Sequence, residues 1–335
     1  MSVREHVTYQ APWWLPGGHL QTIWAALWAR REAVSGLQRH RWTTPDGDFI
    51  DVDRQVASRS DRPQLVLFHG LEGSSASHYA WAWRAWAQRH DLHCVIPHFR
   101  GCSGVLNLAP RAYHSGDHAE VAWILGRLRQ QHRQQGGSCQ LAVGVSLGGN
   151  ALMRWAAEEG AQAVEGVDAA AAVCAPLDLT ASAKAIGQGL NRQIYTRMFL
   201  RSMKPRALAK WHQYPGLFDR DRMLKANDLE AFDEVFTAPL HGFKDARDYW
   251  AKASAKPMLR SVRLPVLLLN ARNDPFIPAQ SLPSGQEVSP SVTLWQPEHG
   301  GHVGFVQGRC PGGLQWVPEQ VGAWLLAQVA NTRGV

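Results

Sequence analysis

The sequence predicts an α/β fold in which a mostly parallel, doubly wound sheet carries helices on both faces. Through the first half of the chain, short apolar runs alternate with stretches of helical periodicity, a pattern typical of repeated strand–helix units. Two strand-like runs near the start predict an antiparallel hairpin in front of the parallel strands. Residues 180–258 lack strand runs and are helical in period. We therefore expect one domain over residues 1–335, with a helical cap insertion at 180–258 within it.

The hairpin is predicted by two runs of strand-like composition, from Arg39 to Thr44 and from Phe49 to Arg54. Between them lie Pro45-Asp46-Gly47-Asp48, which are turn-forming residues. Such an antiparallel pair is common in front of an otherwise parallel sheet.

An N-terminal arm precedes the hairpin. Residues 23–31 predict a short helix with Trp24, Leu27 and Trp28 on one face. We expect this arm to pack on the core. A helix lying on a membrane surface is the alternative, which the short apolar stretch disfavours.

The remaining elements follow in order along the chain. Buried strands are predicted at 64–68, 93–96, 139–143, 167–174, 265–270 and 292–295. Helices are predicted at 76–90, 117–131, 149–159 and 318–329. Because the carboxyl ends of parallel strands meet at one edge of a sheet, functional side chains are expected in the loops that follow the strands.

Composition limits the classes of partner. The net charge of +7 is spread over 335 residues without a basic run, so a nucleic-acid partner is not expected. No apolar stretch reaches membrane-spanning length and the N-terminus lacks a signal segment, so at most peripheral membrane contact is expected. The five cysteines form no CxxC pair, which argues against a disulfide framework and a zinc site. These features together predict a cytoplasmic protein.

The candidate nucleophile lies in Gly144-Val145-Ser146-Leu147-Gly148, a G-x-S-x-G motif between a predicted strand and a predicted helix. This is the pattern of a nucleophile elbow, in which a sharp turn exposes the serine and small neighbours let strand and helix approach. The alternative is a glycine-rich turn whose serine only caps the helix.

A serine nucleophile needs a base, and the base needs a carboxylate that orients it. Asp274 follows the strand at 265–270 and is preferred as that carboxylate; Asp178, after the strand at 167–174, is the rival. His302 is preferred as the base because Gly300 and Gly301 allow the backbone to bend, which leaves His299 a structural or substrate-side role. The order Ser146, Asp274, His302 is the Ser…Asp…His order of this architecture.

An oxyanion site requires two convergent backbone N–H groups. The residue after the nucleophile, Leu147, offers one, and Leu71, in the loop after the strand at 64–68, is the candidate for the other. In the same loop, His69 and Gly70 are expected to contact the substrate. This loop lacks a GxGxxG and a Lys-Ser/Thr ending, so it is not expected to bind a nucleotide.

Four segments together resemble the α/β-hydrolase superfamily and, within it, the AB hydrolase 4 family of YheT-like esterases and their eukaryotic relatives. They are His69 to Gly73, Gly144 to Gly148, Asn273 to Phe276 and His299 to Phe305. The supporting segments are Trp14 to Pro16 with Gly18 to Thr22, Phe99 to Gly104, Tyr113 to Gly116, and Gly242-Phe243 with Asp245 and Tyr249.

The resemblance implies the α/β-hydrolase fold and hydrolysis of carboxylic esters through a triad of Ser146, Asp274 and His302. It implies a small-molecule or lipid ester as substrate, and neither a metal nor an organic cofactor. Many relatives have two adjacent acids where this chain has Asn273 and Asp274, which leaves Asp274 as the carboxylate of that turn. An acyltransferase using the same acyl-enzyme, or a non-catalytic ligand-binding member of the fold, are the alternatives.

Overall fold

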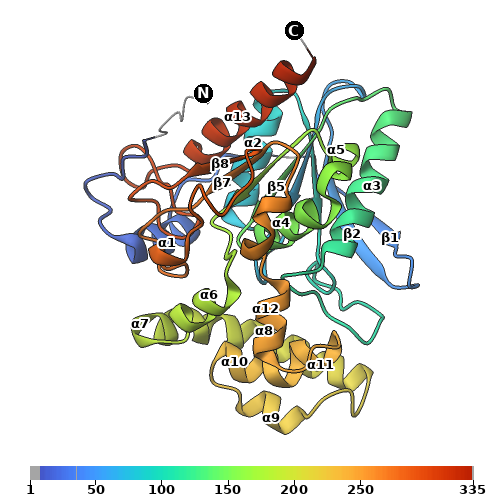
Figure 1. Ribbon diagram of the computed structural model, residues 1–335, viewed down its shortest axis with the longest axis vertical. Helices are drawn as coiled ribbons and strands as arrows, with labels where there is room; N and C mark the ends of the chain where they lie inside the picture. Colours follow the sequence, from blue (N-terminus) through green and yellow to red (C-terminus); the bar gives the residue numbers. More distant parts are fainter. Residues whose placement is uncertain (1–7, 35, 334–335) are drawn as a thin grey trace.

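The computed structural model describes residues 8–34 and 36–333 of the chain. The ends of the predicted domain, residues 1–7 and 334–335, and Ser35 lie outside the described residues. Figure 1 shows a central sheet flanked by helices, with a separate group of helices beyond one end of the strands. The predicted α/β architecture is confirmed.

Among the described residues, the sheet has eight strands in the order β1-β2-β4-β3-β5-β6-β7-β8. β1 is antiparallel to β2, β2 is antiparallel to β4, and all the other neighbours are parallel. The predicted hairpin and the mostly parallel sheet are therefore both confirmed. The strands are β1 (Gln38–Thr43), β2 (Phe49–Gln55), β3 (Gln64–Phe68), β4 (His93–Pro97), β5 (Gln140–Val145), β6 (Ala169–Val173), β7 (Val266–Leu269) and β8 (Val292–Trp295).

Helices cover both faces of the sheet. α2 (His78–Arg89) and α13 (Trp316–Arg333) pack on one face, where Trp83, Trp86 and Val321 join the core. α3 (His118–Gln134) and α4 (Leu147–Glu159) pack on the other face. This burial on both faces explains why the parallel strands read as continuous apolar runs rather than as alternating ones.

The N-terminal helix differs from its prediction. α1 spans Gly18–Leu27, so it begins five residues earlier than expected, and its buried residues are Gln21, Thr22 and Ala25. Leu27 and Trp28, which were expected on the packed face, are 63% and 54% exposed. The reason is that polar side chains of this helix bond to two loops at the carboxyl edge of the sheet.

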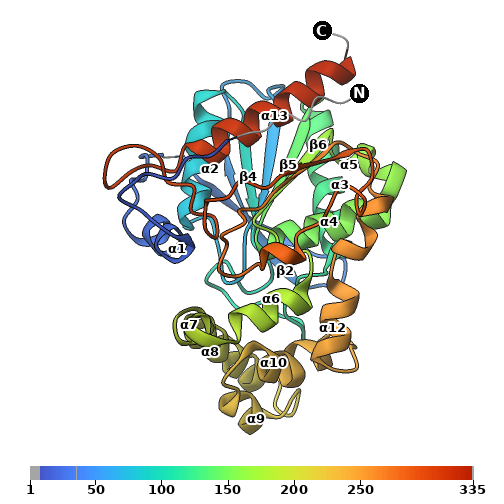
Figure 2. The same ribbon diagram turned by 60° about the vertical axis from the view of Figure 1, so that its left-hand side comes forward.

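Between β6 and β7 the chain forms a helical cap beyond the carboxyl ends of the strands (Figures 1 and 2). An apolar cluster of its own, including Leu200, Phe218 and Phe232, holds the cap helices together. They are α6 (Leu179–Ile186), α7 (Gly189–Asn191), η2 (Arg192–Thr196), α8 (Arg197–Gln213), α9 (Arg220–Lys225), α10 (Leu229–Phe232), η3 (Asp233–Thr237), α11 (Ala238–Leu240) and α12 (Ala246–Ala253). None of the helices described for this chain has both the length and the apolar character that crossing a membrane requires.

Candidate active site

Ser146 occupies a strained turn between β5 and α4, with φ of 53° and ψ of −121°. A side chain on Gly144 would place its Cβ 2.4 Å from the Gly148 carbonyl oxygen, and one on Gly148 would lie 2.5 Å from the His69 carbonyl oxygen. Both positions therefore require glycine. Ser146 is only partly buried there. Backbone strain that the surrounding packing maintains at such a side chain is a feature of functional sites.

The side chain of Ser146 does not cap α4. Its Oγ lies 2.9 Å from His302 Nε2, and His302 Nδ1 lies 2.8 Å from Asp274 Oδ2. The other oxygen of Asp274 accepts the Phe276 N–H at 2.8 Å. Three side chains from widely separated parts of the chain thus form one continuous hydrogen-bonded line.

The two candidate carboxylates have different surroundings. Asp274 follows β7, and its side chain is fully buried against His302. Asp178 follows β6 but caps helix α6, where it accepts the Ala181 N–H at 3.0 Å. Of the two, the structure brings only Asp274 to the histidine.

His302 lies in the loop after β8 and is held on several sides. The ring of Phe276 stacks on the imidazole with ring centroids 4.1 Å apart. Gly300 and Gly301 adopt φ of 145° and 61°, the backbone bend expected to turn this histidine toward the sheet edge. His299 is exposed, and its Nδ1 lies 3.4 Å from Asn273 Nδ2, so it is outside the hydrogen-bonded line.

Helix α1 holds the histidine loop, a role that the sequence reasoning missed. Thr22 Oγ1 accepts the His302 N–H at 2.8 Å, and Gln21 Oε1 accepts the Gly300 N–H at 2.9 Å. Asn273 Oδ1 accepts the Gly301 N–H at 2.9 Å, and Asn273 Nδ2 donates to Gln21 Oε1 at 3.0 Å. The resemblance already included Gly18 to Thr22 as a supporting segment, but the residues to which Gln21 and Thr22 bond are more than 250 positions away in the sequence.

Replacing Thr22 by valine is expected to misplace His302. The substitution keeps the shape of the side chain but leaves a buried backbone N–H without its acceptor, which costs roughly 1–3 kcal/mol. We expect kcat to fall about ten- to a hundredfold, since small misplacements of a catalytic group have effects of this size. Thr43→Val, on the exposed face of β1, is the control. Unchanged kcat and unfolding temperature in Thr22→Val would contradict this role.

The two candidate oxyanion donors border the same space. Leu71 and Leu147 line the cavity together with Ser146 and His302. Within the described part of the chain, neither backbone N–H donates a hydrogen bond. Both groups are therefore free to donate to a ligand atom.

The expected substrate contacts of His69 and Gly70 need correction, because neither residue lines the cavity. His69 is completely buried; its Nδ1–H donates to the Gly70 carbonyl at 2.8 Å, and its Nε2 accepts the Phe99 N–H at 3.1 Å. The Gly70 N–H donates to the Tyr79 hydroxyl at 2.8 Å. With these groups already bonded, the pair shapes the loop that carries Leu71.

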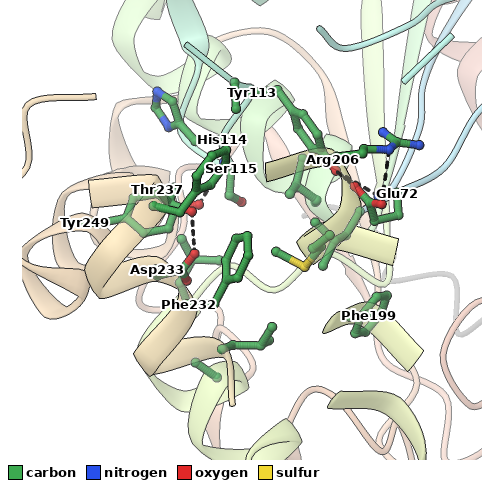
Figure 3. Close-up of a pocket in the computed structure, with 18 of the residues that line it drawn as sticks. Glu72, Tyr113, His114, Ser115, Phe199, Arg206, Phe232, Asp233, Thr237 and Tyr249 are labelled. Carbon is green, nitrogen blue, oxygen red and sulfur yellow. Dashed lines mark hydrogen bonds and ion pairs between the residues drawn. The ribbon is translucent and has the colours of Figure 1, made fainter. Parts of the chain in front are cut away.

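The cavity extends from Ser146 into the cap and is lined mostly by apolar side chains. The cavity volume, measured as the space that water centres can occupy, is about 150 Å³. Figure 3 shows Phe199 and Phe232 directed into this space. The apolar residues that the cap contributes include Leu179, Ile186, Phe199, Met203, Leu229, Phe232 and Phe236.

The cavity wall also carries polar side chains, and Figure 3 shows two groups of them. On one side, Arg206 of α8 lies 3.4 Å from Glu72, which follows Leu71 and accepts the Tyr113 hydroxyl at 3.0 Å. On the other side, Asp233 accepts the Thr237 hydroxyl at 2.6 Å, and burial raises the pKa of the Asp233 carboxyl to about 6. The first group links a cap helix to the loop of Leu71.

Cys174, Asp274 and His302 place three possible metal-ligating atoms within 4.8 Å of one another. Burial, and to a lesser extent the nearby Asp274, raise the pKa of the Cys174 thiol well above its usual value, so it stays protonated. Its Sγ accepts the Val303 N–H at 3.2 Å. A neutral thiol and an imidazole already bonded to the carboxylate suit proton transfer better than metal binding.

Comparison with known sequences identifies the fold. A family model described as the alpha/beta hydrolase fold matches residues 63–309. The chain is 38% identical over 311 residues to "Putative esterase YheT" of Escherichia coli (strain K12), covering 92% of this chain and 89% of that protein. It is 27% identical over 312 residues to "Phospholipase ABHD3" of Homo sapiens, covering 91% and 75% of the two chains.

Solved structures agree with this fold. Est1E of Butyrivibrio proteoclasticus with bound ferulic acid aligns with a TM-score of 0.54 at 14% identity, over 87% of this chain and 99% of that one. The predicted α/β-hydrolase fold is confirmed.

Proposed function

This chain belongs to the AB hydrolase 4 family of the α/β-hydrolase fold, and from that premise we propose that it is a serine hydrolase of carboxylic esters. The observation that carries the proposal is the hydrogen-bonded line from Ser146 through His302 to Asp274, at one end of an apolar cavity. Relatives named as an esterase and as a phospholipase support ester cleavage as the reaction.

In the first half of the reaction, Ser146 Oγ attacks the ester carbonyl carbon while His302 Nε2 takes the hydroxyl proton. Asp274 stabilises the resulting imidazolium and holds its Nδ1–H in place. The N–H groups of Leu71 and Leu147 stabilise the negative carbonyl oxygen. The ester C–O bond then breaks, His302 gives its proton to the leaving alcohol, and the acyl group stays on Ser146.

In the second half, water attacks the acyl-enzyme. His302 Nε2 takes a proton from the water, and the new C–O bond forms at the acyl carbon. When the bond to Ser146 Oγ breaks, the proton returns from His302 to the serine. The products are a carboxylic acid and the regenerated enzyme, and the balance needs no oxidant or reductant.

We place the acyl chain of the substrate in the cap. The apolar side chains that α8, α10 and η3 contribute to the cavity would surround a hydrocarbon chain. Each buried CH₂ group contributes about 0.8 kcal/mol, so chain length should strongly affect the reaction. The substrate class that fits is a small-molecule or lipid ester with an aliphatic acyl group.

A series of p-nitrophenyl esters with increasing acyl length tests the proposal. We expect hydrolysis of all of them, with kcat/KM rising up to about fourfold per CH₂ until the cavity is full. The reaction is followed by p-nitrophenol release, and the acid product is identified separately. Absence of turnover over the whole series would refute ester hydrolysis. Accumulation of a new ester when a competing alcohol is added would indicate an acyltransferase instead.

A further inference from the structure

A groove on the outer surface of the cap collects positive charge. It runs along the first half of α8 and is bordered by η2 and by the end of α9. We define this basic groove by its cationic residues, Arg192, Arg197, Arg201, Lys204 and Lys225. The helices that form the basic groove lie at the end of the molecule opposite α13 (Figures 1 and 2).

Most of this charge is not neutralised. Arg192 donates to Asn227 at 2.9 Å and lies 4.0 Å from Asp228, and Lys204 donates to the Leu224 carbonyl at 2.7 Å. In the part of the chain that the structure describes, Arg197, Arg201 and Lys225 form neither ion pairs nor hydrogen bonds. Like charges one helical turn apart repel each other, so this arrangement favours an external anion.

The basic groove is separate from the active-site cavity. Arg197, Arg201 and Lys204 lie at intervals of four and three residues, which places them on one side of α8. Met203, Arg206 and Lys210 of the same helix line the cavity instead. A ligand on the outer side therefore approaches the cap without occupying the site of Ser146.

Exposed apolar side chains lie within two residues of these cations in the sequence. Leu190, Met198 and Leu224 are 57%, 54% and 43% exposed. A bilayer containing anionic lipids offers both of the matching environments, negative headgroups and an apolar interior below them. Single-stranded nucleic acids need stacking partners as well as charge, and no aromatic residue lines the groove.

From this combination of charge and exposed apolar side chains, we propose that the basic groove docks the cap onto membranes that contain anionic lipids. The contact is peripheral and electrostatic, so it weakens as salt concentration rises. It would hold the apolar cavity close to lipid, but it does not depend on the hydrolase activity and is measured without it.

Sedimentation of the full chain with lipid vesicles tests the proposal. One set of vesicles contains only phosphatidylcholine and the other also contains phosphatidylglycerol. We expect binding to the second set, reversed by salt. The combined change Arg197→Gln, Arg201→Gln and Lys225→Gln should weaken it about tenfold or more, given the contribution of each basic residue near an anionic surface. These side chains are exposed and form no hydrogen bonds or ion pairs among the described residues, so folding should be retained.

A control with the same change in net charge removes three arginines at the amino ends of the parallel strands, through Arg59→Gln, Arg133→Gln and Arg263→Gln. These residues precede strands or end a helix at the amino ends of the parallel strands, and all three are exposed. The control should bind anionic vesicles like the unchanged chain. Equal weakening by both triple changes would reduce the effect to net charge and overturn the proposal.

Three further results would also overturn it: equal binding to both vesicle types, full binding by the groove variant, or binding of single-stranded RNA in place of vesicles. Hydrolysis of a soluble p-nitrophenyl ester is measured on the same samples. Both triple variants should retain whatever turnover the unchanged chain has. Failure of the vesicle experiment is therefore distinguishable from failure of the proposed hydrolase function.

Discussion

Replacing Ser146 by alanine is expected to lower kcat for ester hydrolysis by about 10⁴-fold or more, since removing a nucleophile eliminates the covalent route. The substitution should lower catalysis without affecting folding. Alanine has no larger side chain than serine and meets the same backbone strain at φ of 53°, so the unfolding temperature should change little. The measurements are p-nitrophenyl ester turnover and thermal unfolding of both proteins.

Ser182 provides a matched control for this change. It is buried, lines the same cavity, and its hydroxyl has no hydrogen-bond partner among the described residues. Ser182→Ala should therefore retain turnover within a few-fold of the unchanged chain. Comparable turnover in Ser146→Ala, or loss of turnover in Ser182→Ala alone, would show that Ser146 is not the nucleophile.

The elbow around Ser146 could be predicted from sequence because its determinants are local. A short apolar run, closely spaced glycines and a helical stretch lie within about twenty residues, and each of them constrains the same turn. The strands of the parallel sheet were predicted for the same reason, since burial on both faces leaves continuous apolar runs. Element ends differ by a few residues, as at α4, which begins at Leu147 rather than at Gly149.

The support around His302 could not be predicted in this way. Thr22 and Gln21 bond to residues almost three hundred positions later in the chain, and no periodicity encodes such contacts. These two residues also explain why α1 is oriented differently from the prediction. Their hydrogen bonds to the loop of His302 bury the polar side of the helix and leave Leu27 exposed. A buried hydrogen-bonded network here outweighs the apolar stripe that the sequence suggested.

The two functional sides of helix α8, within the predicted helical cap, could not be predicted from the sequence for a related reason. Its residues serve two surfaces at once, an inner one that lines the cavity and an outer one that carries the basic groove. Lys210 is buried although lysine is rarely buried, because its Nζ donates to the carbonyls of Asn107 and Ala109 at 2.8 Å. A helix that lines a cavity on one side and carries charged residues on the other lacks the single apolar stripe from which a buried side is predicted.

The contacts among Arg206, Glu72 and Tyr113 join the cap to the loop of Leu71. Glu72 adopts φ of 57° immediately after Leu71, and its N–H donates to the Tyr113 hydroxyl at 2.9 Å. Arg206 reaches the same carboxylate from the cap. The position of the Leu71 N–H is therefore tied to the position of α8, which connects the cap physically to one of the two proposed oxyanion donors.

Replacing Asp274 by asparagine is expected to lower kcat by about 10³- to 10⁴-fold, by the tautomer effect known for triads. The surroundings of Asp274 determine how the amide must sit. Its Oδ1 accepts the Phe276 N–H at 2.8 Å, so an asparagine here keeps its carbonyl oxygen on that donor. The amide NH₂ then points at His302 Nδ1, which must give up its proton to accept the bond. That single ring proton then resides on Nε2, so the imidazole can no longer accept the proton of Ser146.

Asp178→Asn separates this effect from a general loss of carboxylate charge. Asp178 caps α6 through the Ala181 N–H, and asparagine is an equally good cap, so turnover and stability should stay close to those of the unchanged chain. KM should change little in Asp274→Asn, because the substituted atom lies behind the imidazole and does not line the cavity. Replacing a triad carboxylate leaves far less than a tenth of the turnover. If Asp274→Asn kept more than about a tenth, His302 would not depend on this carboxylate for its tautomer.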